Sequence, residues 1–484
     1  MAELMMKRRT FCRDLILGTA GLAVRQAHSA QTPKRHNILL ITTDDLGPYL
    51  GCYGDTQART PHLDKLAKES MRFELAFVTQ PSCSPSRSSM FTGLYPHQNG
   101  QIGLSHRGYS MDKAYPTLPS LLKQGGYRTG VIGKIHVAPD AAFPFDFRKT
   151  AVGLTRDVGG VAGQAEGFMR RSGDRPFFLM VNYFDPHRPL VDQVKGVPAK
   201  PLGPDDVTPF AFLGVDTPKV RKEVAGYYNC VTRADVGVGL LMERLAKTGH
   251  ADDTVVIFLG DHGPPFTRAK TTCYEAGLRI PFIVRWPGRG KSGQVRQEMI
   301  STVDILPTVM DAAGLPAPEG LPGQSLTPLI EGKSVPWRET LCAEYTSHGK
   351  KCFFPRRSIR DRRYKLILNL LGDRPNPVKA VDGCAAWEAS RDPKLEGTPA
   401  RLAHDTCHRP PRVELYDLEK DPIEFRNLAG KAEFREIEKR LLVALEQWRK
   451  LTRDPLLDPE KLAALARSHD EAKRDRPVKK RAKR

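Results

Sequence analysis

The sequence lacks long hydrophobic runs. Beyond the N-terminal region, no apolar run reaches the length of about 18 residues that indicates a membrane-spanning helix, so we expect no membrane span. The sequence also has no nucleic-acid-binding motif, and we expect no nucleic-acid partner in spite of a formal net charge of +20. The positive excess fits an anionic substrate, or simply a basic surface.

The positions of the cysteines follow no recognisable motif. No C-x-x-C motif and no regular spacing occurs, which argues against a zinc site and against a disulfide framework. Cys352, Cys384 and Cys407 could include one pair, but the sequence does not say which. The nine cysteines are residues 12, 52, 83, 230, 273, 342, 352, 384 and 407.

The two ends of the chain have segments of unusual composition. Residues 7–11 (KRRTF) are basic with paired arginines, residues 15–24 are weakly apolar, and residues 27–30 (AHSA) end in small residues. Residues 1–30 thus resemble a twin-arginine export signal, which implies a partner in the export machinery and a periplasmic or secreted protein. The alternative is an ordinary basic N-terminus with a short helix. At the other end, residues 463–484 read as a basic, disordered tail.

Continuous apolar runs alternate with helical patterns up to about residue 345. Such runs are typical of buried parallel strands, and their alternation with helices predicts a doubly wound α/β domain over residues 35–345 with a mostly parallel sheet. The predicted strands are His36–Thr43, Thr129–Ile132, Phe177–Phe184 and Thr254–Leu259. The predicted helices are Pro61–Arg72, Thr117–Gln124 and a long one that follows the N-cap Thr217 and ends at Gly249.

The pattern changes in residues 346–462, for which we predict a smaller α+β domain. Arg357–Leu370 indicates strand, turn and strand, and Val413–Asp417 indicates a further strand. An irregular stretch rich in Pro and Gly lies between them, at residues 371–411. An amphipathic helix follows, with its apolar face formed by Phe434, Ile437, Leu441, Leu445 and Trp448.

Polar residues follow each predicted strand. Asp44 and Asp45 follow the first, Lys134 and His136 the second, Asp185 and His187 the third, and Asp261 and His262 the fourth. Because ligands of open α/β sheets bind at the carboxyl ends of the strands, we expect these residues to meet at one edge. Asp44, Asp45 and Asp261 offer hard oxygen ligands that suit Ca²⁺ or Mg²⁺, and His262 also admits Mn²⁺ or Zn²⁺.

Other residues of this edge predict binding of an oxyanion. Lys134 and His136 lie two apart, so in an extended segment they would share one face, and Lys270 follows Asp261 after a Pro-Pro loop. Pro85 suits the first turn of a helix and would place Cys83 just before its N-terminus, where an anion is stabilised. Arg87 lies one turn further on. Taken by itself, Cys83 could be a buried cysteine or a thiolate of lowered pKa.

Two motifs carry a family resemblance. Residues 83–93 (CSPSRSSMFTG) resemble the sulfatase signature, which is C-x-P-x-R followed by an apolar pair and Thr-Gly, and residues 126–136 (GYRTGVIGKIH) resemble the second sulfatase signature. The chain is similar to this family from about residue 37 to residue 459. The resemblance implies an alkaline-phosphatase-like fold, and oxidation of Cys83 to formylglycine by a formylglycine-generating enzyme acting on residues 83–87.

The resemblance also implies roles for the site residues. Asp44, Asp45, Asp261 and His262 would hold one divalent metal, most simply Ca²⁺, although sulfatases often have Asn where His262 stands. Arg87 would hold the hydrate of the aldehyde, and Lys134, His136, His187 and Lys270 would surround the sulfate. One hydroxyl of the hydrate would attack sulfur, His187 or Lys270 would protonate the leaving group, and His136 would deprotonate the second hydroxyl to release sulfate.

The resemblance extends to the heparan N-sulfatases within the family, through residues 83–104, 130–147, 174–188 and 414–422. It implies cleavage of the N-sulfate of a terminal glucosamine in a heparan-type or heparin-type glycan, with Asp185 as a candidate contact to the sugar. Lys270 departs from that subfamily, which usually has Arg there. An O-sulfatase of another glycan, a phosphonate or phosphodiester hydrolase, and a binding protein without activity are the alternatives.

Overall fold

The structure is a computed structural model that describes residues 35–377 and 385–474, which lie in one compact unit. Eight strands form its main sheet in the order β4-β3-β5-β1-β6-β7-β2-β8, and β7 alone runs antiparallel to its two neighbours. The predicted α/β class with a mostly parallel sheet is therefore confirmed. The strands are β1 (Asn37–Thr43), β2 (Met71–Phe77), β3 (Arg128–Ile132), β4 (Phe147–Lys149), β5 (Phe177–Tyr183), β6 (Thr254–Gly260), β7 (Arg279–Arg285) and β8 (Val295–Ser301).

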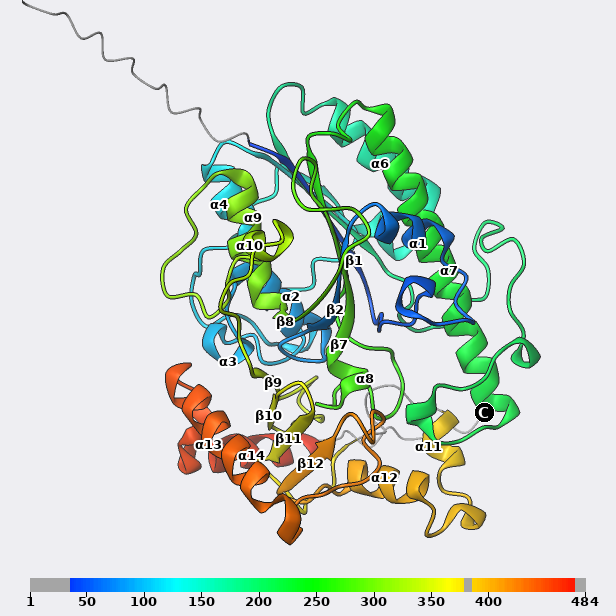
Figure 1. Cartoon of the computed structure of the whole chain (residues 1–484), viewed down its shortest axis with the longest axis vertical. Helices are drawn as coiled ribbons and strands as arrows, with labels where there is room; N and C mark the ends of the chain where they lie inside the picture. The colour runs from blue at the N-terminus through cyan, green and yellow to red at the C-terminus, as the bar shows by residue number, and fades with distance from the viewer. Residues whose placement is uncertain (1–34, 378–384, 475–484) are drawn as a thin grey trace, which may run out of the picture. The chain divides into compact units, whose positions relative to one another are not determined.

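The central strand β1 explains why the sheet is covered on both faces. Its side chains alternate, so that Ile38 and Leu40 enter one hydrophobic core while Leu39 and Ile41 enter another. Helices α2, α4 and α9 pack against the first face, and α1, α6 and α7 against the second (Figure 1). Burial on both faces is the reason that the sequence of β1 is a continuous apolar run.

The helices of this part largely follow the predicted pattern. Helix α7 begins after Thr217, whose hydroxyl accepts a hydrogen bond from the amide of Val220, and it ends just before Gly249. The helix predicted over residues 61–72 is wrong at its end, because α1 stops at Lys68 and Arg72 belongs to β2. The helices are α1 (Pro61–Lys68), α2 (Cys83–Thr92), α3 (Pro96–Asn99), α4 (Leu118–Gln124), α5 (Thr150–Leu154), α6 (Val158–Arg170), α7 (Pro218–Lys247), α8 (Glu275–Leu278), α9 (Ile305–Ala313) and α10 (Thr327–Ile330).

A second, antiparallel sheet follows, with the strand order β12-β11-β10-β9. One face of it packs against α13 through Leu366, Leu415 and Leu441, while Ile367 on the other face joins the main core. The strand–turn–strand, the strand at 413–417 and the amphipathic helix are confirmed. The elements are β9 (Leu341–Tyr345), β10 (Arg356–Arg360), β11 (Tyr364–Asn369), α11 (Ala385–Ala389), α12 (Pro399–His408), β12 (Val413–Asp417), α13 (Arg435–Leu451) and α14 (Pro459–Arg474).

Two predictions about this region are wrong. The stretch 371–411 is not irregular throughout, because it contains α11 and α12. The disordered tail predicted from residue 463 is wrong for residues 463–474, since helix α14 runs to Arg474 and buries Ala466 and His469 at helical spacing. The boundary at 345/346, close to the end of β9, stays a prediction.

Several predictions concern residues that the structure does not describe. The export signal at 1–30 and the end of the basic tail lie outside the described residues, as does Cys384. Cys407 is a free thiol, which excludes it from the pair considered above. Among the described residues, no helix is both long enough and apolar enough to cross a membrane.

Candidate active site

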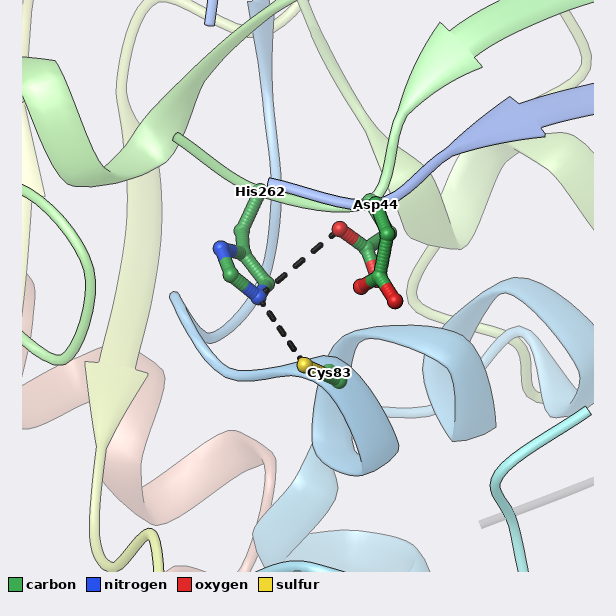
Figure 2. Close-up of side chains that lie close together, drawn as sticks. Asp44, Cys83 and His262 are labelled. Atoms are coloured by element: carbon green, nitrogen blue, oxygen red, sulfur yellow. Dashed lines mark hydrogen bonds and ion pairs between the residues drawn. The ribbon is translucent and has the colours of Figure 1, made fainter. Parts of the chain in front are cut away.

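The carboxyl ends of β1, β5 and β6 bring the predicted site residues together. The amide of Asp261 donates to Thr43 O at 2.9 Å, and the amide of Asp44 donates to Tyr183 O at 3.1 Å. The residues that directly follow the three strands are thereby held side by side at one edge of the sheet. Figure 2 shows the side chains of Asp44, Cys83 and His262 pointing toward one another from this edge and from α2.

Three carboxylates are buried here within a few ångströms of each other. Asp44, Asp45 and Asp261 are each 0% exposed. Oδ1 of Asp261 accepts a hydrogen bond from the backbone amide of Asp45 at 2.9 Å. The pKa of Asp261 is raised to about 7, first by burial and then by the negative charge of Asp44. Among the described residues, Asp44 Oδ1 and Asp45 Oδ1 are sealed from solvent without a hydrogen-bond partner. Buried carboxylate oxygens that lack a hydrogen bond are what a divalent cation requires, so these residues fit a metal.

His262 is oriented as a metal ligand would be. Its Nδ1 donates to the carbonyl of Gly263 at 2.9 Å, which leaves Nε2 facing the carboxylates. Nε2 lies 3.1 Å from Asp45 Oδ1 and 3.7 Å from Asp261 Oδ1. Ligand atoms of Asp44, Asp261, His262 and Cys83 all lie within 4.8 Å of one another. Position 83 therefore adjoins the predicted metal residues.

Cys83 differs slightly from its predicted place. It does not precede helix α2 but is the first residue of it, with Ser82 as N-cap. Its Sγ lies 3.3 Å from His262 Nε2. Burial raises the pKa of the thiol, but Lys134, Lys270 and His262 outweigh burial and hold that pKa well below its usual range. The environment of position 83 is thus basic in spite of the three aspartates.

Three cations balance these aspartates. Arg87 donates from Nε to Asp261 Oδ2 at 2.9 Å and from Nη1 to the carbonyl of Lys134 at 3.0 Å. Lys134 Nζ lies 2.5 Å from Asp44 Oδ2, and Lys270 Nζ lies 2.9 Å from Asp45 Oδ2. Each lysine is therefore paired with one of the two aspartates that directly follow β1.

The segment after β3, which carries Lys134 and His136, is not extended throughout. Gly133 and His136 both have positive φ, of 90° and 59°. A non-glycine residue in this region is strained, and such residues concentrate at functional sites. Both side chains still reach the site, since Lys134 pairs with Asp44 and a hydrogen bond from His136 lowers the pKa of Cys83.

His187 faces the site from the turn after β5. Its Nδ1 donates to the carbonyl of Arg188 at 2.5 Å, and Nε2 lies 4.0 Å from Asp45 Oδ2. Burial opposes protonation, but Asp45 raises the pKa of His187 to about 9. Its side chain is 24% exposed, so it stands where the site opens to solvent.

Asp185 has a different environment from the one expected of a sugar contact. Arg233 of α7 donates to both of its oxygens, at 2.7 and 2.9 Å, and Arg156 lies 2.9 Å from Oδ1. Arg156 also donates to the carbonyl of His187 at 2.7 Å. These contacts are those of a buried ion pair that fixes the turn, and the sugar contact stays a prediction that they do not favour.

Sequence analysis missed two histidines of the site. His106 lies in the exposed loop after α3, with its Nδ1 2.7 Å from His136 Nε2 and its ring stacked on that of His136. His348 lies after β9, with its Nδ1 2.8 Å from the hydroxyl of Ser82. Neither histidine follows a strand of the main sheet. The pattern of polar residues at strand ends, which located the other site residues, therefore could not identify them.

Comparisons with known proteins agree with this geometry. Residues 36–315 match the family described as Sulfatase, and residues 260–373 match the family described as N-sulphoglucosamine sulphohydrolase, C-terminal. Human N-sulphoglucosamine sulphohydrolase is 35% identical over 458 residues, which cover 87% of this chain and 91% of that protein. An ulvan-active sulfatase of Formosa agariphila is 31% identical, over 88% of this chain and 82% of that protein.

A solved structure shares the fold. It is described as BT4656 in complex with its substrate D-glucosamine-2-N,6-O-disulfate, and it has a TM-score of 0.65 and 21% identity over 87% of this chain and 99% of that chain. The predicted alkaline-phosphatase-like fold is thereby confirmed. With the two signature segments gathered around Cys83 and the family match over more than half of its length, the chain belongs to the sulfatase family.

Proposed function

We propose that this sulfatase removes the N-sulfate of a terminal glucosamine in heparan-type or heparin-type glycans. The observation that carries the proposal is the similarity to human N-sulphoglucosamine sulphohydrolase over nearly the whole of both chains. The match of residues 260–373 to the C-terminal family of that enzyme supports it, because this match includes Asp261, His262 and Lys270 of the site as well as β9, β10 and β11.

The metal is proposed to be Ca²⁺, held by Asp44, Asp45, Asp261 and His262. Three carboxylates favour a hard cation, and one imidazole is compatible with it. When bound, such a cation polarises sulfate oxygens and lowers the pKa of a hydroxyl beside it. Lys134 and Lys270, each 2.9 Å or less from one of these carboxylates, would meet the remaining negative charge of the sulfate.

Position 83 is proposed to carry formylglycine, made from Cys83 by a formylglycine-generating enzyme that acts on residues 83–87. The hydrate of that aldehyde supplies two hydroxyls on one carbon, one to take the sulfuryl group and one to expel it. Arg87, whose Nη2 lies 2.9 Å from Asp261 Oδ2, would hold this group. The start of α2 adds free amide groups that stabilise negative charge at position 83.

Two histidines would move the protons. His187, whose pKa is raised to about 9 by Asp45 against burial, would donate a proton to the leaving nitrogen. His136, whose pKa burial lowers to about 4, is neutral and would accept the proton of the second hydroxyl. His106, at 2.7 Å from His136 Nε2, would fix the orientation of that ring.

An O-sulfatase of another sulfated glycan is the second candidate, since the ulvan-active sulfatase is nearly as similar to this chain over an equal share of its length. The phosphonate or phosphodiester hydrolase remains the third. Turnover of N-sulfoglucosamine, 6-O-sulfated glucosamine and a phosphodiester by the purified enzyme separates the three. The proposal requires the first to have the highest kcat/KM, and preference for either of the others would overturn it.

The protein is also proposed to act in the periplasm or outside the cell after export through residues 1–30. Export of a folded protein would allow Cys83 to be modified before the chain leaves the cytoplasm. Fractionation of the producing cells tests the location, and a mature N-terminus close to residue 30 is the expected result.

A further inference from the structure

The loop after β9 joins the C-terminal sheet to the segments that flank the nucleophile. Ser347 donates from its amide to Ile102 O at 3.2 Å and accepts at its carbonyl from Gln80 Nε2 at 3.2 Å. Its hydroxyl lies 3.1 Å from the hydroxyl of Tyr109. Three contacts on one residue fix the backbone of this loop, so the next side chain, that of His348, is held in a defined position.

His348 has one nitrogen engaged and one available. Its Nδ1 lies 2.8 Å from the hydroxyl of Ser82, the N-cap residue directly before Cys83. Its Nε2 has no hydrogen-bond partner among the described residues, and it is not sealed from solvent. The residue is only 5% exposed, so this nitrogen is the part of a buried ring that a ligand can reach.

The charged groups that act on His348 include the site residues Lys270, Cys83 and His262. Burial lowers the pKa of His348 most, and the positive charges of Lys270 and Arg107 lower it further. Lys270 is 4% exposed and paired with Asp45, while Arg107 is exposed and lies against Gly349, where an added Cβ would be 2.6 Å from its Cδ. His348 is therefore within electrostatic reach of one buried cation of the site, Lys270, and of one exposed cation, Arg107.

From this geometry we infer that His348 is a substrate-contacting residue, which binds the sugar that carries the sulfate through its Nε2. The inference rests on the proposed function in requiring a sulfated sugar as substrate. The C-terminal sheet would then contribute directly to substrate choice, while Ser82 acts as the positioning residue that orients the ring. A neutral imidazole suits a hydroxyl or amino group of a sugar, because it offers one hydrogen bond without adding charge.

Two substitutions separate this role from a structural one. In His348→Asn the amide takes the place of Nδ1 and can keep the contact with Ser82, whereas in His348→Gln it takes the place of Nε2. A substrate contact predicts about a tenfold loss of kcat/KM for the sulfated sugar in His348→Asn and a smaller loss in His348→Gln. Turnover of para-nitrophenyl sulfate, which has no sugar, should change little in either variant.

The exposed Lys350 of the same loop provides the matched control, and Lys350→Ala should leave both substrates unaffected. A greater loss in His348→Gln than in His348→Asn would overturn the inference, and so would an equal loss on both substrates. All variants are first checked for the aldehyde by mass spectrometry. If N-sulfoglucosamine is not a substrate of the unsubstituted enzyme, the proposed function fails, and the same comparison with whichever sulfated sugar it hydrolyses still tests His348.

Discussion

Arg233→Met tests how the turn that carries His187 is held. Arg233 and Asp185 form a two-point ion pair with side chains 0% and 3% exposed. Removal of Arg233 leaves the buried carboxylate with Arg156 as its one cationic partner among the described residues. Breaking a buried ion pair costs about 3–5 kcal/mol. Because Arg156 remains, we expect the free energy of unfolding to fall by about 3 kcal/mol, at the lower end of that range.

Helix α7 offers a matched control. Arg221 and Asp216 form the same two-point pair, at 2.6 Å for both bonds, but with side chains 34% and 46% exposed. Arg221→Met should therefore cost far less stability than Arg233→Met, because solvent screens an exposed pair. Denaturant unfolding followed by tryptophan fluorescence measures both variants, and kcat should fall only for Arg233→Met because His187 is displaced. Equal stability losses in the two variants, or a loss below about 1 kcal/mol for Arg233→Met, would refute the reasoning.

The remaining predictions concern pH and metal. Burial lowers the pKa of His404 from 6.5 to about 4, so the neutral ring stabilises the fold above pH 6.5 and this contribution is lost as the pH falls through about 4. His404→Gln, which can keep the hydrogen bond to Leu213 O, should therefore show a smaller drop in melting temperature over that range, and an equal drop would count against burial as the cause. Lys134→Met removes the cation 2.5 Å from Asp44. Because this charge competes with the metal, calorimetry should show Ca²⁺ binding about tenfold more tightly while turnover falls. An unchanged affinity for Ca²⁺ would contradict the geometry. Exhaustive chelation should lower the melting temperature and abolish turnover, with both restored by Ca²⁺, and turnover that survives in protein shown to be metal-free would rule out the metal.

Much of the main sheet could be predicted because its central strands are buried on both faces. In β1, β5 and β6 every residue is buried, and each therefore forms a continuous apolar run in the sequence. Strands β2 and β8 have partly exposed residues, and their mixed composition gave no such signal. The end of α1 was misplaced for the same reason, since Met71 and Arg72 extend a helical pattern although they pair in β2.

The site could be predicted as far as it follows the sheet. Residues directly after β1 and β6 had to meet, because parallel strands end at one edge. Contacts that depend on loops or on the second sheet could not be foreseen. His348, for example, contacts Ser82 from the loop after β9, in which Ser347 accepts a hydrogen bond from Gln80. The pairing of Asp185 with Arg233 likewise depends on how α7 packs, and this packing cannot be predicted from the sequence near Asp185.

The most direct test of the account is the mass of the peptide that contains Cys83, taken from active protein recovered after export. Conversion of the thiol side chain to an aldehyde lowers the mass of this peptide by about 18 Da, and we expect that form to predominate and its share to rise in step with turnover. A peptide that carries only the unmodified thiol, from protein that is fully active, would contradict the central claim.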